Sequence, residues 1–137
     1  MPNQKDRVVI DTNLWISFLL TKDLKKLDTI IAVQELTLII SQELIDEIVE
    51  VTQRSKFRRY FPLDDVEELL IKIRSRGILT NVTSIVTDCR DLKDNFLLAL
   101  SMDGKATHLI TGDKDLLELE TFGMTKVLTI TEYLMQL

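Results

Sequence analysis

Val8-Val9-Ile10-Asp11 is the stretch of sequence that most constrains the fold. Three β-branched residues in a row, with no polar residue between them, are typical of a strand buried on both faces of a parallel sheet. An acidic residue directly after such a strand lies at the carboxyl edge of the sheet, where open α/β sheets bind their ligands. This stretch therefore predicts an α/β protein and indicates where its functional residues should lie.

Short apolar runs alternate with helical patterns along the rest of the chain. Strands are expected at 8–10, 36–40, 107–111 and 126–130, and 78–86 has strand character without a clear partner. Helices are expected at 14–34 (one or two, with Asp23 as a cap between them), after a cap at Ser41, at 64–76, 91–102 and 131–136, with short turns at 54–59 and 116–119. This alternation predicts one three-layer α/β/α domain over residues 1–137, with a central, mainly parallel sheet.

Composition excludes several classes of protein. The 137 residues fit one domain, and the 45% hydrophobic content can form its core. A net charge of −5 excludes binding to nucleic acid through bulk positive charge, although a local basic groove is compatible with it. One Cys and one His exclude an internal disulfide and a Cys/His zinc cluster. With a polar start and no long apolar run, we expect a cytoplasmic protein outside the membrane.

Four acidic residues fall at the end of a predicted strand or near the start of the helix that follows one. They are Asp11, Glu47, Asp94 and Asp113. Because the carboxyl ends of parallel strands share one edge of the sheet, we expect these side chains to converge there. Carboxylates that lie close together raise one another's pKa unless a cation is present. A cluster of acids without His or Cys favours a hard, oxygen-binding ion, Mg²⁺ or Mn²⁺.

Each acid in this region also has a purely structural interpretation. Asp11 and Asp91 precede predicted helices and fit as N-caps, and Asp115 is predicted to cap the helical turn that follows it. Asp94 would lie in the first turn of its helix, where the helix dipole favours an anion. Asp91 therefore competes with Asp94 for a place in the cluster.

Glu47 is the best candidate among the acids of its helix. Its neighbours at i−3 and i+4 are Leu44 and Val51, so it should lie at the edge of the buried face. Glu43 and Glu50 are expected to point away from that face, which makes Glu43 the natural control for Glu47.

A basic strip, consisting of Arg54, Lys56, Arg58 and Arg59, is followed by Tyr60 and Phe61. One interpretation is a solvated helix end that the helix dipole favours. The functional interpretation is a surface that binds RNA phosphates and offers an aromatic ring for stacking on a base.

Four segments together resemble the PIN-domain ribonucleases. They are Val9-Ile10-Asp11-Thr12-Asn13, Ser41-Gln42-Glu43-Leu44-Ile45-Asp46-Glu47-Ile48, Arg90-Asp91-Leu92-Lys93-Asp94-Asn95 and Leu109-Ile110-Thr111-Gly112-Asp113-Lys114-Asp115-Leu116. Their order and spacing match over residues 7–134, and the first and last segments are the most specific. Within the family, the chain is most similar to bacterial toxin components of toxin–antitoxin pairs.

The resemblance implies a parallel sheet flanked by helices and Mg²⁺- or Mn²⁺-dependent cleavage of RNA. Matched by position, the family's acidic quartet is Asp11, Glu47, Asp94 and Asp113. Asp115 is a further candidate metal ligand, and Asn13 and Thr111 would be polar residues that support the cluster. The resemblance also implies a homodimer and, for toxin members, inhibition by a protein antitoxin.

Two other functions remain open from the sequence alone. A receiver-type phosphoacceptor domain also gathers acids at a sheet edge and binds Mg²⁺. It normally has adjacent acids after its first strand and a lysine at a late strand end, whereas here Thr12 follows Asp11 and Lys126 precedes its strand. The other alternative is a PIN-like binding module without catalytic activity.

Overall fold

The computed structural model describes residues 5–22, 28–29 and 36–136. Their strands form one six-stranded sheet in the order β3-β2-β1-β4-β6-β5, which is parallel except for the β5–β6 pair. The strands are β1 (Arg7–Ile10), β2 (Thr37–Ile40), β3 (Gly77–Leu79), β4 (His108–Ile110), β5 (Thr121–Phe122) and β6 (Thr125–Leu128).

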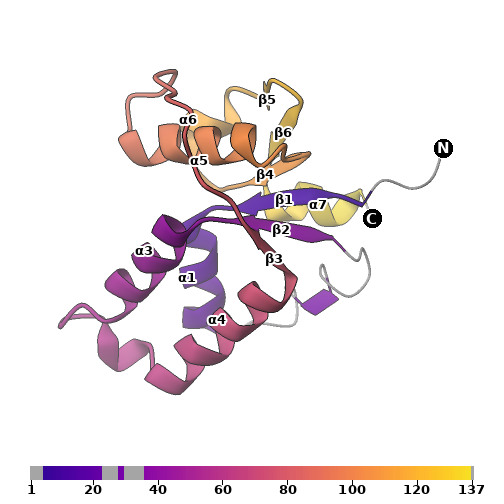
Figure 1. Cartoon of the computed structure of the whole chain (residues 1–137). Helices are drawn as coiled ribbons and strands as arrows, with labels where there is room; N and C mark the ends of the chain where they lie inside the picture. Colours follow the sequence, from indigo (N-terminus) through magenta and orange to yellow (C-terminus); the bar gives the residue numbers. More distant parts are fainter. Residues whose placement is uncertain (1–4, 23–27, 30–35, 137) are drawn as a thin grey trace.

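Helices cover both faces of this sheet. Figure 1 shows α1, α3 and α4 on one side and α5 and α6 on the other. The helices are α1 (Thr12–Thr21), α3 (Gln42–Thr52), α4 (Leu63–Arg76), α5 (Leu92–Asp103), α6 (Lys114–Leu117), α7 (Ile130–Met135) and the short 3-10 helix η1 (Arg58–Tyr60). The predicted three-layer α/β architecture is confirmed. Within the described residues, every helix is too short or too polar to span a bilayer.

The core forms around the central strands, as the opening run of sequence predicts. Val8, Val9 and Ile10 are at most 1% exposed, so β1 is covered on both faces. Trp15 and Phe18 are buried beside it, with ring centroids 6.1 Å apart in an edge-to-face arrangement. Burial of each large side chain contributes about 1.5–3 kcal/mol, which fixes α1 against the sheet.

The order of the strands reverses between β1 and β4. From β1 the chain moves outward to β2 and β3, and then returns across the opposite face through α5 to β4. Ile10 lies opposite Ile110 in the parallel register, and the N–H of Asp11 donates to the Ile110 carbonyl at 3.0 Å. Asp11 and Thr111 therefore leave neighbouring strands at the same level, at the crevice where α/β sheets bind ligands.

Local signals predicted several helix starts correctly. The Ser41 hydroxyl accepts a hydrogen bond from the N–H of Leu44 at 3.1 Å, and the Asp91 carboxylate accepts one from the N–H of Lys93 at 2.8 Å. The helix expected from residue 14 begins at Thr12, because Asp11 is its cap. The predicted cap at Asp23 lies outside the described residues.

Two expected strands end at least two residues earlier in the structure. Of residues 78–86, only Ile78 and Leu79 belong to a strand, because the N–H groups of Thr83 and Ser84 bind the Asp103 carboxylate instead of a neighbouring strand. The strand expected at 126–130 ends at residue 128, where the hydroxyl of Thr129 starts α7.

The β5–β6 hairpin was not predicted from the sequence. Its turn contains Gly123 in a left-handed conformation, with φ +59°, which glycine adopts at low cost. A strand of two residues is too short to show the alternation of apolar and polar side chains by which strands are recognised.

Candidate metal centre

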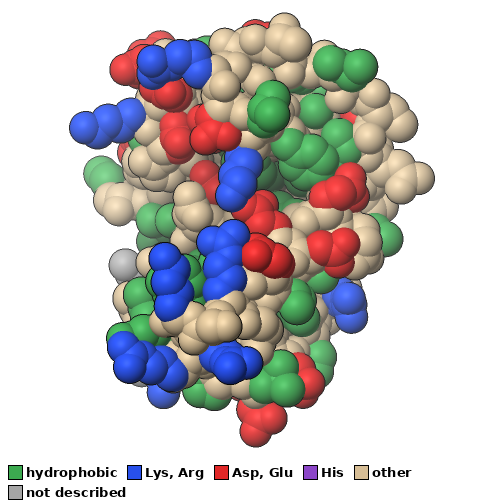
Figure 2. Space-filling view, turned by 90° about the vertical axis from the view of Figure 1, so that its left-hand side faces the viewer, with side chains coloured by type: hydrophobic (Ala, Val, Ile, Leu, Met, Phe, Trp, Pro, Cys, Tyr) green, Lys and Arg blue, Asp and Glu red, His purple; other side chains and the backbone are tan. Residues whose placement is uncertain are grey.

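Acidic side chains line a cleft at the carboxyl edge of the sheet. The cleft has a volume of about 270 Å³ and lies where α1, α3, α5 and the loop after β4 meet. Figure 2 looks onto this edge and shows the Asp and Glu side chains gathered around a hollow in the middle of the face. Its charged lining residues are Asp11, Glu43, Glu47, Asp91, Lys93, Asp94 and Asp113. The predicted convergence of the four acids is therefore present in the fold.

Asp11 is buried at the base of the cleft. One carboxylate oxygen accepts a hydrogen bond from the N–H of Asn13 at 3.1 Å, and the other accepts one from the Thr111 hydroxyl at 2.8 Å. Burial raises the pKa of Asp11, and the two hydrogen bonds act in the opposite direction. Thr111 thus supports the cluster through its side chain, whereas Asn13 contacts Asp11 through its backbone.

Asp94 lies in the first turn of α5 and is 4% exposed. Its Oδ2 atom is buried and has no hydrogen-bond partner among the described residues. Burial, the largest cause, and the negative charges of Asp113, Asp91 and Asp11 together raise the pKa of Asp94 to about 6. Asp91, the competing candidate, is exposed and caps the helix.

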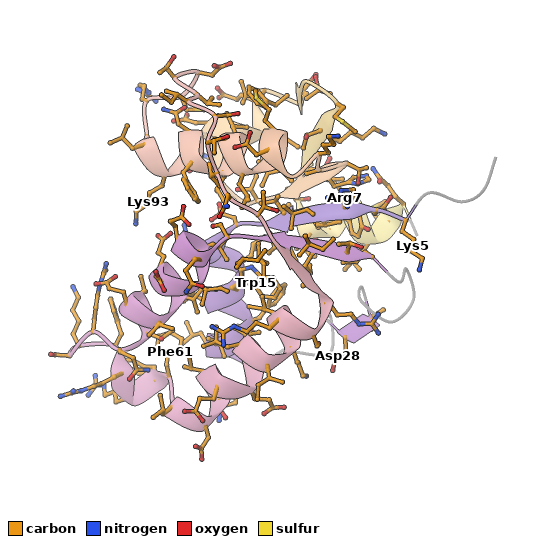
Figure 3. All side chains as sticks on the ribbon, viewed as in Figure 1. Lys5, Arg7, Trp15, Asp28, Phe61 and Lys93 are labelled. Atoms are coloured by element: carbon orange, nitrogen blue, oxygen red, sulfur yellow. The ribbon has the colours of Figure 1, made fainter. Side chains whose placement is uncertain are left out.

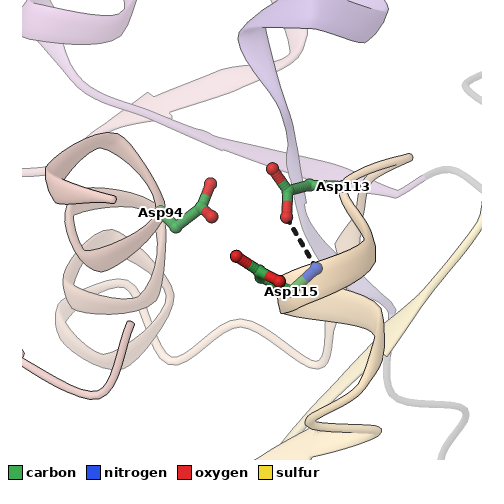
Figure 4. A group of neighbouring side chains, drawn as sticks. All are labelled: Asp94, Asp113 and Asp115. Carbon is green, nitrogen blue, oxygen red and sulfur yellow. Dashed lines mark hydrogen bonds between the residues drawn. The ribbon is translucent and has the colours of Figure 1, made fainter. Parts of the chain in front are cut away.

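Asp94, Asp113 and Asp115 form a three-carboxylate group. Each offers an oxygen atom that lies within 4.8 Å of the other two (Figure 4). Carboxylate oxygens at such separations repel one another in the ionised state. The group therefore favours either a bound proton or a bound cation.

The predicted role of Asp115 as a helix cap is wrong. Asp113 caps α6, and its Oδ1 atom accepts hydrogen bonds from the N–H groups of Asp115 at 2.9 Å and Leu116 at 3.2 Å. The helix begins at Lys114 and not at residue 116 as expected, because the Asp113 carboxylate already accepts hydrogen bonds from the first N–H groups of α6. The Asp115 carboxylate is instead 3.3 Å from the guanidinium group of Arg90.

Glu47 lies on the opposite wall of the cleft, with its side chain 30% exposed. Its Oε2 atom accepts a hydrogen bond from the Thr12 hydroxyl at 3.3 Å, and its Oε1 atom is 3.0 Å from Lys93 Nζ. Glu47 is thus at the edge of the buried face, as its neighbours predict. Sequence reasoning missed Thr12 and Lys93, because both contacts join separate elements and leave no periodic signal.

Glu43 is exposed and points away from the buried face, as expected, but its place beside the cleft makes it unsuitable as the control for Glu47. Glu43 lines the cleft together with Glu47. Helical periodicity identified the face of α3 that packs on the core, but it does not show that the start of α5 lies across from the first turn of α3. Asp46 is exposed, and its one side-chain partner among the described residues is Gln42, at 2.9 Å, so it is a better control for Glu47.

The basic strip lies outside the lining of the cleft. None of its four residues belongs to the described lining of the cleft. Two hydrogen bonds of 2.9 Å pair Arg54 with Glu50, and the Arg59 guanidinium lies 4.7 Å from the Tyr60 ring centroid. Phe61 is buried, so Tyr60, 48% exposed, is the aromatic residue available for stacking. A role in RNA binding stays a prediction.

His108 and Cys89 lie in structural surroundings. The His108 ring packs edge-on against Tyr133 at 5.1 Å, and burial lowers its pKa. Burial also raises the pKa of the Cys89 thiol, which disfavours the nucleophilic thiolate. The chemistry of the cleft is therefore that of carboxylates.

A comparison with known families gives the same assignment. The family model of the PIN domain matches residues 7–115, which include the four predicted acids and Asp115. No curated protein matches the chain. PIN domains are generally nucleases and typically bind divalent metal through acidic residues. By this match over most of its length, the chain belongs to the PIN-domain family.

Proposed function

We propose that this protein is an endoribonuclease that uses Mg²⁺ or Mn²⁺ to hydrolyse RNA phosphodiester bonds. The observation that carries the proposal is the buried Oδ2 atom of Asp94, for which the described residues offer no hydrogen-bond donor and which belongs to a group with Asp113 and Asp115. A carboxylate buried without a partner is costly. A divalent cation in the three-carboxylate group would remove that cost.

The donor set fits a hard ion. Asp94, Asp113 and Asp115 offer only carboxylate oxygens, and Asp11 extends the set at the base of the cleft. Oxygen ligands of this kind suit Mg²⁺ and Mn²⁺ and do not suit copper or structural zinc. When bound, the ion would lower the pKa of water and neutralise charge on the reacting phosphate.

The chain's own residues would supply orientation and a proton acceptor. Hydrogen bonds to Thr111 and to the start of α6 hold the carboxylates of Asp11 and Asp113 in place. Glu47, held by Thr12, is positioned to accept the proton of the water that attacks phosphorus. The reaction is then a direct hydrolysis, in which no covalent bond forms between the enzyme and RNA.

The resemblance to bacterial toxin components supports a role in a toxin–antitoxin pair. In this proposal the protein acts in the cytoplasm as the toxin of a toxin–antitoxin pair, as a homodimer that a protein antitoxin inhibits. The basic strip would bind the RNA backbone outside the cleft.

Cleavage of a fluorescently labelled single-stranded RNA tests the enzymatic proposal. Wild type should cleave it with Mn²⁺ or Mg²⁺ and stop when EDTA is added. Asp11→Asn should lose at least about 100-fold in rate while its circular dichroism spectrum is unchanged. Asp46→Asn, on an exposed face of α3, should cleave at the wild-type rate. Full activity of Asp11→Asn would contradict the proposal. Labelling of the protein by acetyl phosphate would favour the receiver alternative.

A further inference from the structure

Lys93 bridges the mouth of the acidic cleft. It lies in the first turn of α5, directly before Asp94, and its side chain reaches toward α3 (Figure 3). The Nζ atom is 3.0 Å from Oε1 of Glu47, and the Lys93 side chain is 69% exposed. Lys93 thus joins the two walls of the cleft through a contact that faces solvent.

The charge of the cleft makes this lysine distinctive. Six carboxylates line the cleft, and Lys93 is the only cationic side chain among its described lining residues. A phosphodiester is itself an anion, so an approaching phosphate is repelled by most of the surface that it meets. The ammonium group of Lys93 is therefore the positively charged group of this lining that a phosphate oxygen can contact.

We propose that Lys93 binds the phosphate of the substrate, an inference that rests on the proposed nuclease function. In the substrate complex, its ammonium group leaves Glu47 and donates to a non-bridging phosphate oxygen. An exposed ion pair is weak, so this exchange costs little, and the four-carbon stem of lysine allows it.

The exchange would also prepare Glu47 for its role. Without substrate, Oε1 of Glu47 is engaged by Lys93, while Oε2 is held by Thr12. When the ammonium group moves to the phosphate, Oε1 is free to accept the proton of the attacking water. Lys93 thus couples the arrival of the phosphate to the release of the proton acceptor.

The experiment compares Lys93→Gln and Lys93→Arg with a matched control. Lys72→Gln removes another lysine that pairs with a carboxylate, at 3.2 Å from Asp28, and that does not line the cleft. Three quantities are measured for each protein: KM and kcat for a single-stranded RNA, the salt dependence of RNA binding by fluorescence anisotropy with Mg²⁺, and the Kd for Mn²⁺ by calorimetry.

If Lys93 binds phosphate, its loss should weaken RNA binding and strengthen Mn²⁺ binding. Lys93→Gln should raise KM about 10-fold with a smaller change in kcat, and reduce the salt slope of RNA binding by about 0.7, the share of one phosphate contact on a single strand. The same variant should bind Mn²⁺ about two- to five-fold more tightly, because Glu47 loses a competing cation. Lys93→Arg should restore RNA binding, and Lys72→Gln should match wild type throughout.

The outcomes separate this inference from the nuclease proposal. If wild type cleaves RNA and Lys93→Gln keeps the wild-type KM and salt slope, the role of Lys93 is refuted while the nuclease stands. If wild type does not cleave, the nuclease proposal fails, and the anisotropy data still decide whether Lys93 binds phosphate. A variant that binds both RNA and Mn²⁺ more weakly would show a structural role and overturn the inference, as would absence of RNA binding by every protein.

Discussion

The two walls of the acidic cleft differ in how the negative charges of their carboxylates are compensated. On the α5 and α6 side, Asp94, Asp113 and Asp115 meet, and the buried Oδ2 atom of Asp94 has no hydrogen-bond donor in the described part of the chain. On the α3 side, Glu47 has a hydroxyl donor and an ammonium group from the protein itself. The first wall has the exposed Arg90 guanidinium group at Asp115 but, among the described residues, no cation paired with Asp94 or Asp113, whereas the second wall has an ammonium group at Glu47. The comparison teaches that acids in one cleft need not share one role.

Asp94→Asn should produce the largest effect. Metal affinity should fall at least about 100-fold and cleavage about 1000-fold, since a central ligand is lost. Without divalent ions at pH 7, the same variant should melt at a higher temperature than wild type, because it removes a buried charge that has no partner. Calorimetry with Mn²⁺ and thermal unfolding in EDTA measure the two effects. A lower melting temperature in EDTA would contradict our account of this wall.

The pH dependence of stability is a second measurement on the same wall. Asp94 has a pKa of about 6 in the folded protein, against its ordinary value of 3.8. Between these values the folded state keeps a proton that the unfolded state has lost, so the free energy of unfolding should fall as pH rises from about 4 to 6. The loss is at most about 3 kcal/mol. Urea unfolding in EDTA, compared between wild type and Asp94→Asn, isolates it, and equal slopes for the two proteins would refute it.

Glu47→Gln should distinguish the second wall from the first. Cleavage should fall about 100-fold, the usual contribution of a proton acceptor, while the Kd for Mn²⁺ changes less than about 10-fold. The readouts are single-turnover cleavage and calorimetry, and Asp46→Asn is the matched control. If Glu47→Gln loses metal as completely as Asp94→Asn, then Glu47 is a main ligand and the two walls are equivalent.

The smallest effects should come from the two buried threonines that support the walls. The Thr111 hydroxyl donates to Asp11 and accepts from the N–H of Asp113 at 3.1 Å, whereas the Thr12 hydroxyl makes one hydrogen bond within the described residues, to Glu47 at a longer 3.3 Å. Thr111→Val should therefore slow cleavage about 10- to 30-fold, and Thr12→Val only about 3-fold. Both variants make the same chemical change, and the reverse order of their rates would contradict the comparison.

Sequence patterns were most informative where the signal is local. The apolar run of residues 8–10 predicted a buried central strand, and Ser41 and Asp91 predicted the starts of α3 and α5, because a cap bonds backbone groups two or three residues away. Where two acids could each cap the same helix, the local sequence does not decide between them. Asp113 and Asp115 are both plausible caps, and the end of β4 decided in favour of Asp113.

The sequence by itself determined the alternation of strands and helices, and hence that Asp11, Asp94 and Asp113 lie at one edge of a parallel sheet. The alternation can be predicted because the apolar residues of each segment recur with the period of a strand or of a helix, a pattern that does not depend on the rest of the chain. Tertiary structure decided the rest: which Asp94 oxygen lacks a partner, that Glu43 faces the cleft, and that Lys93 reaches Glu47. Those contacts depend on how α5 crosses the sheet to face α3, and no local pattern encodes the distance between side chains that are 46 residues apart in the chain.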